Sequence, residues 1–176
     1  MNSTNLVKIE TDGFPETVDL AGWAEDLLDD ALKLFAAKEG WKGVGGYCVL
    51  ADLTTGMPQW VRLIGTLGHK PHMLTANLYF PLSAAETLAG HPEHVSTFQH
   101  RNAVAALHLG AIRAASFIFA FYGNGIPELL GEAMMLVLAV KVGDMQMEAA
   151  AEVAALSQNP YFVELAEKFL ELDSEA

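Results

Sequence analysis

The side chains of this sequence that could do chemistry are gathered in its middle. All six histidines fall between residues 69 and 108, and Arg101 and Arg113 lie in or close to the same stretch. Histidine can carry protons near neutral pH, ligate a metal, or bind an anion when it is protonated. The six histidines are His69, His72, His91, His94, His100 and His108. We expect any functional site to lie in this region.

The charge distribution singles out the same region. Residues 1–40 carry a net charge of −6, residues 41–125 of +2 and residues 126–176 of −8, within a chain of net charge −12. An anionic small molecule would be drawn to the only segment with a local excess of positive charge. We therefore predict a ligand-binding surface with a positive character. Its candidate residues are His72, His94, His100, Arg101 and Arg113.

A plainer interpretation stays open for the same five residues. Arg113 could pair with a carboxylate of a terminal helix, and the histidines could be separate surface residues that never meet. The segment His91-Pro92-Glu93-His94 holds residue types that ligate metals. A zinc-protease helix, however, needs two histidines four residues apart, with a glutamate directly after the first. We assign no metal ligands and expect local hydrogen-bonding roles here.

Composition excludes several classes of protein. A net charge of −12 and a pI near 4.7 disfavour binding to nucleic acid and to anionic membrane surfaces. The longest apolar run, 133–140, is far shorter than the ~20 residues of a membrane span. Cys48 is the sole cysteine, which fits a reducing cytoplasm, and a secretory signal is not visible. A phosphate-binding loop, a nucleophile elbow and a complete dinucleotide fingerprint are all missing.

The elements that would position these residues follow from local patterns. Apolar spacing predicts a helix over 17–37 that ends at Gly40. Segments 46–53 and 59–65 predict a hairpin whose turn uses Gly56. Cys48 falls within the first of these strands, where we expect a core residue. Residues 66–73 are interpreted as a loop, 83–88 as a short helix, and Pro92 as the start of another helix.

The second half begins with the strand or strand pair 110–122. Phe117, Phe119 and Phe121 alternate on one face, so we expect a central strand covered on both sides. Pro127 opens a helix to about residue 142 that is apolar all round, which suggests burial or a subunit contact. Two further helices are predicted. One covers 145–156, with Asp144 as its N-cap, and the other covers 160–172, with Asn159 as its cap. In the second helix, Glu164 and Lys168 are spaced for an ion pair.

This order of elements resembles a known family. The strand pair GYCVLADLTTGMPQWVRLIG and the Gly-Ala-Ile segment at 110–112 are similar to the profilin-like α/β proteins of bacterial haem-utilisation and glycolate operons. The resemblance covers about residues 45–125 and rests on element order. It implies a sheet flanked by helices and, for some members, haem binding. We carry over no residue role from it.

Together these patterns predict a single α+β domain over 1–176. It has one antiparallel sheet flanked by helices and a helical C-terminal third. The function we expect is that of a cytoplasmic small-ligand-binding or sensory module that forms a homodimer, with its cofactor unknown. One alternative is a histidine-containing, metal-dependent enzyme. The other is an interaction or structural protein without a small-molecule site.

Overall fold

One antiparallel sheet organises the protein. The computed structural model describes residues 20–41, 44–67, 71–100 and 110–170. The sheet has four strands in the order β2-β1-β4-β3, and every neighbouring pair runs antiparallel. The elements are α1 (Leu20–Glu39), β1 (Gly45–Asp52), β2 (Pro58–Gly65), α2 (Pro71–Ala89), the 3₁₀ helix η1 (Thr97–His100), β3 (Ala111–Arg113), β4 (Phe117–Tyr122), α3 (Glu128–Lys141), α4 (Met147–Ser157) and α5 (Phe162–Phe169). The predicted α+β fold with one antiparallel sheet and a helical C-terminal third is confirmed.

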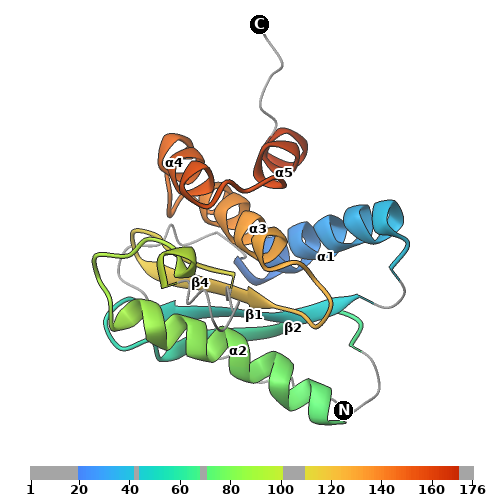
Figure 1. Cartoon of the computed structure of the whole chain (residues 1–176), viewed down its shortest axis with the longest axis horizontal. Helices are drawn as coiled ribbons and strands as arrows, with labels where there is room; N and C mark the ends of the chain where they lie inside the picture. The colour runs from blue at the N-terminus through green and yellow to red at the C-terminus, as the bar shows by residue number, and fades with distance from the viewer. Residues whose placement is uncertain (1–19, 42–43, 68–70, 101–109, 171–176) are drawn as a thin grey trace, which may run out of the picture.

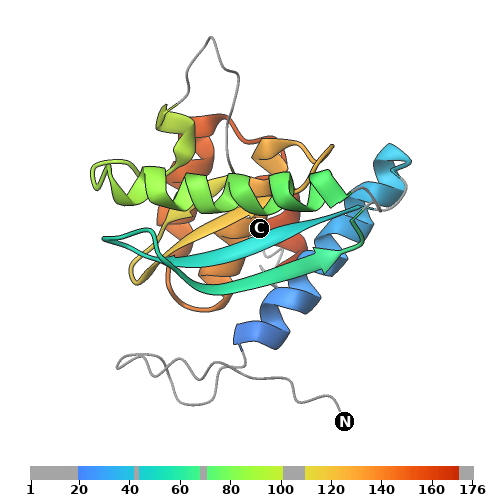
Figure 2. The same cartoon turned by 90° about the horizontal axis from the view of Figure 1, so that it is seen from below.

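Helices cover the sheet on both faces. In Figure 1, α2 lies below the sheet, α1 and α3 lie above it, and α4 and α5 form a further layer beyond α3. Figure 2 shows α2 from its own side, running across the sheet and leaving β2 uncovered. Val61 and Leu63 of β2 are accordingly exposed. No helix in the described part of the chain is long and apolar enough to cross a membrane.

The β1–β2 hairpin has the predicted turn. The carboxylate of Asp52 accepts hydrogen bonds from the backbone N–H groups of Thr54 and Thr55, at 3.0 and 2.8 Å. Gly56 then takes a φ of +69°, a conformation that costs a residue without a side chain little. Cys48 of β1 is fully buried, and burial raises the pKa of its thiol far above the usual range. It is the core residue that the sequence predicts.

β4 is an interior strand, between β1 and β3. Phe117, Phe119 and Phe121 pack into the main core with α1 and α3, whereas Ile118 and Ala120 belong to the smaller core under α2. This two-sided burial confirms the central strand predicted from the alternating phenylalanines. Of the two arrangements that the sequence allows for segment 110–122, the structure has the pair of strands, β3 and β4.

The second quarter of the chain departs from prediction. A single helix, α2, begins at Pro71 and continues through Pro81 to Ala89. The sequence predicts a loop over 66–73 and a separate short helix over 83–88 instead. Burial of Ala84, Ala85 and Leu88 against the sheet stabilises the longer helix, although Pro81 can donate no hydrogen bond inside it. Pro92 starts no helix; a turn follows it, and then η1.

The apolar helix α3 is buried within the subunit. Every residue from 130 to 139 is buried, since α3 lies between the sheet on one side and α4 and α5 on the other. Intramolecular packing therefore accounts for the all-round apolar character that suggested a dimer. Self-association stays a prediction, and the apolar character of α3 no longer supports it.

Two cap predictions and one ion-pair prediction are wrong. Gln146 is the N-cap of α4, and the Asp144 carboxylate instead accepts the backbone N–H groups of Ser116 and Phe117 in the β3–β4 turn. Tyr161, rather than Asn159, is the N-cap of α5. Glu164 pairs with Lys38 of α1 instead of Lys168, which attaches α5 to the first helix.

Candidate metal centre

Three imidazole rings meet at the end of α2. One nitrogen from each of His91, His94 and His100 lies within 4.8 Å of the others. Nδ1 of His94 is 2.7 Å from Nε2 of His100, so one of these nitrogens donates a hydrogen bond to the other. The His91 ring centroid is 4.0 Å from that of His100 and 5.5 Å from that of His94. We call these three residues the histidine triad.

A short, hydrogen-bonded segment brings the triad together. After α2 ends, the backbone N–H of His91 donates to the carbonyl of Leu88, and that of His94 donates to the carbonyl of His91, which closes a turn. The Gln99 side chain then accepts the N–H groups of Val95 and Ser96, at 2.7 and 3.1 Å. The chain reverses over these few residues, so His100, at the end of η1, comes back against His94.

The core fixes this segment from behind through a buried carboxylate. Glu132 of α3 is only 2% exposed. It accepts hydrogen bonds from the hydroxyls of Ser96 and Ser157 and, at 3.0 Å, from the amide of Asn159. A buried carboxylate is tolerated only where hydrogen bonds replace its hydration. Because Ser96 lies two residues after His94, this network fixes the histidine segment to α3 and α4.

Arg113 provides the second anchor. Its Nε donates to the carbonyl of His94 at 3.2 Å, its Nη1 donates to that of Leu53 at 3.0 Å, and its Nη2 donates to that of Leu88. A planar guanidinium is well suited to several acceptors in fixed directions. The β1–β2 turn, the end of α2 and the histidine segment are therefore joined at one side chain.

Electrostatics favour a neutral His100 ring and an ionised Glu93 carboxylate at this place. Burial, together with the neighbouring His91 and His94, lowers the pKa of His100. The backbone of Glu93 itself and the His91 ring lower the pKa of the Glu93 carboxyl. Imidazole must be neutral to ligate a metal, and at neutral pH His100 is held in that form.

The arrangement suits a metal ion of the zinc class. Zinc bonds to imidazole nitrogen at about 2.0–2.1 Å, so two nitrogens on one tetrahedral ion lie about 3.3 Å apart. The 2.7 Å contact between His94 and His100 has to open by about 0.6 Å to reach that spacing. Rotations of exposed or half-buried side chains are enough for such a change. Within the described residues, this is the group of histidine, cysteine and acidic side chains that could hold a metal.

The five residues predicted for the site have different positions. His94 and His100 meet, and Arg113 contacts the backbone of the segment that carries them. His72 belongs to the first turn of α2, which places its backbone about 25 Å along the helix axis from the end that precedes the triad. Arg101 lies outside the described residues. Among the described residues, the partners of the Arg113 guanidinium are three backbone carbonyls and not a carboxylate.

From the sequence, His91 and His94 were weighed together as metal-ligand types but not assigned, and Ser96 and Glu132 were missed. His91 could have been found by combining the clustering of the histidines with a turn at Pro92, which returns the chain on itself. No local signal pointed to Glu132, because its role depends on α3 packing beside η1 and the end of α4.

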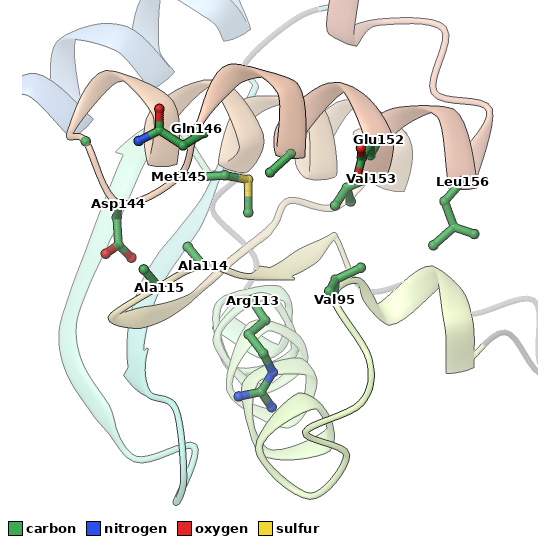
Figure 3. Close-up of a pocket in the computed structure, with 12 residues that line it drawn as sticks. Val95, Arg113, Ala114, Ala115, Asp144, Met145, Gln146, Glu152, Val153 and Leu156 are labelled. Atoms are coloured by element: carbon green, nitrogen blue, oxygen red, sulfur yellow. The ribbon is translucent and has the colours of Figure 1, made fainter.

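A groove lies on the other side of Arg113. It has a volume of about 580 Å³ and runs between the β3–β4 turn and α4. Figure 3 shows the Arg113 side chain pointing away from α4, while Met145 points into the space between the two walls. Its walls are mostly apolar and include Val95, Ala114, Ala115, Met145, Ala149, Val153 and Leu156. Val95 directly follows His94, so the histidine segment also forms part of this groove.

Arg113→Lys is expected to lower the free energy of unfolding by about 2–3 kcal/mol. Lysine keeps the charge but cannot donate to three carbonyls in these fixed directions, and hydrogen bonds from charged groups contribute about 1.5–3 kcal/mol each, not additively. Urea unfolding measures the change. Arg62→Lys is the matched control, because the Arg62–Glu25 ion pair is partly exposed and contributes under about 1 kcal/mol. Equal effects of the two changes would contradict the anchoring role of Arg113.

No family model, no curated protein and no solved structure matches this chain. The resemblance to the profilin-like family is thus neither supported nor opposed by these comparisons, and function has to be argued from the site itself.

Proposed function

We propose that this protein binds a divalent transition-metal ion of the zinc class through His91, His94 and His100. The observation that supports the proposal is the convergence of one nitrogen from each ring within 4.8 Å. The second support is that Glu132 and Arg113 fix the segment from the core, so little order has to be gained when the ion binds. A preorganised site loses less free energy to ordering than a flexible one.

The ligand type favours one class of metal. Imidazole suits zinc, copper, nickel and iron, whereas calcium and magnesium prefer oxygen ligands. A histidine set without thiolate or several carboxylates is therefore expected to discriminate strongly against calcium and magnesium. This proposal takes up the metal-dependent alternative in a reduced form, as metal binding without an assigned reaction.

Calorimetric titration of the metal-free full chain with Zn²⁺ tests the proposal. We expect one ion per chain with a Kd of about 1 μM or tighter, equivalent to about −8 kcal/mol. At a free zinc concentration of 100 times Kd, binding only to the folded state adds about 2.7 kcal/mol of stability, which raises the melting temperature by about 5–10 °C.

Ca²⁺ and Mg²⁺ serve as control ions in the same titration, and neither should bind or stabilise. An absence of zinc binding below about 100 μM, or an equal response to calcium, would contradict a histidine metal site.

A second candidate function is the binding of a small molecule in the groove beside α4. The groove volume of about 580 Å³ falls within the range of about 300–1,000 Å³ that is common for ligand sites. Arg113 and Asp144 both hydrogen-bond to backbone groups, and Glu152, the other charged residue in the lining, is acidic. The walls therefore favour an apolar, uncharged molecule over the anion expected from the charge distribution. Chemical-shift changes of the Met145 methyl group on addition of an apolar fragment library would test this candidate.

A further inference from the structure

We infer that a metal ion bound by the histidine triad keeps one coordination position open and takes a small anion there. The inference rests on the proposed function, and it concerns which ligand the site would accept beyond the protein's own side chains. The position of Glu93, the acidic residue beside the triad, decides whether the metal has a fourth protein ligand.

Glu93 lies on the side of the His94 ring that faces away from His100. Nδ1 of His94 is the nitrogen that lies 2.7 Å from His100, whereas Nε2 of His94 is the nitrogen that lies 3.9 Å from Oε1 of Glu93. The two nitrogens of an imidazole point in different directions. An ion held between His94 and His100 would therefore bond to Nδ1 of His94, and the Glu93 oxygen would face the other nitrogen.

The His91 ring gives the same assignment. Its Nδ1 lies 3.3 Å from Oε1 of Glu93, within hydrogen-bonding distance, which leaves Nε2 free to face a metal. One carboxylate oxygen thus lies beside a nitrogen of each of two rings. The contact to His91 is within hydrogen-bonding distance, and that to His94, at 3.9 Å, is longer. A carboxylate that accepts the N–H of a ligating histidine orients the ring without bonding to the metal.

If Glu93 orients the rings and does not bond to the metal, the ligands among the described residues are the three neutral imidazoles of the triad. A zinc-class ion that has three protein ligands completes a tetrahedron with water or an exogenous group. The ligands add no negative charge, so the ion keeps its full double charge and attracts anions. The side chains of His91 and His94 are 47% and 24% exposed, so solvent reaches this place. A small anion such as azide or a short carboxylate fits these conditions.

Cobalt spectroscopy of the full chain tests the inference. Co²⁺ replaces Zn²⁺ in such sites and has visible absorption bands that report its ligands. We expect bands on addition of Co²⁺ to the wild-type chain, and a saturable change of those bands on titration with azide that acetate competes away. Bands that ignore azide would overturn the inference and leave the proposed function standing. An absence of any cobalt bands would overturn both.

Glu93→Gln separates the two possible positions of the carboxylate. As an outer residue, its loss should weaken metal affinity about tenfold and leave the azide response in place. If azide changed the spectrum only in this variant, Glu93 would be the fourth ligand and the inference would be wrong. Glu86→Gln is the matched control, because Glu86 is exposed on α2 and should change neither readout.

Discussion

His94→Ala is expected to weaken zinc affinity by at least about 100-fold. The His94 ring centroid lies 4.3 Å from that of His100 and 5.5 Å from that of His91, and losing a direct ligand should exceed the 10–100-fold cost that is typical of outer residues. Its side chain is only partly buried, so the variant should stay folded. Calorimetric titration gives the affinity, and circular dichroism of the metal-free variant checks the fold.

His72→Ala is the matched control for this result. The backbone of His72 lies at the opposite end of α2, so its removal should leave zinc affinity within about twofold of the wild type. A loss of affinity in His72→Ala equal to that in His94→Ala would place the metal elsewhere. His100→Ala should reproduce the effect of His94→Ala, because the two rings are in direct contact.

Phe119→Ala is expected to lower the free energy of unfolding by about 3–5 kcal/mol. Phe119 is fully buried on the interior strand β4, opposite Leu50 of β1, and a cavity left by a buried phenylalanine cannot close completely. Urea unfolding measures the loss. Val163→Ala, at a residue that is 64% exposed, is the control and should change stability by less than about 0.5 kcal/mol. A loss below about 1 kcal/mol for Phe119→Ala would contradict its place in the core.

The fold could be predicted where short-range patterns decide the structure. The alternating phenylalanines of β4 and the turn at Gly56 each carry their own signal, so the sheet was foreseen. Helix α2 was not, because Pro81 disfavours an uninterrupted helix, and the burial of Leu88 against strands distant in sequence outweighs that local preference. The local sequence likewise predicts Asp144 as a helix cap, whereas its carboxylate hydrogen-bonds to the β3–β4 turn, which lies far from it in the sequence.

The candidate site was predictable only in part. The clustering of histidines and positive charge located the region, but His94 and His100 were expected in a surface that binds an anion, and no metal ligand was assigned. The inclusion of His91 depends on the turn at Pro92, which was interpreted as a helix start. The anchors Glu132 and Arg113 are decided by tertiary contacts with Ser96 and with three separate carbonyls, which a single sequence does not encode locally.

The most direct test of the account is an anomalous diffraction measurement at the zinc absorption edge, on crystals of the full chain grown with one equivalent of Zn²⁺. The account predicts a single strong peak bonded to His91, His94 and His100 at about 2.0–2.1 Å from each ligating nitrogen. A peak at any other group of side chains, or none at the triad with zinc present, would contradict the proposed function.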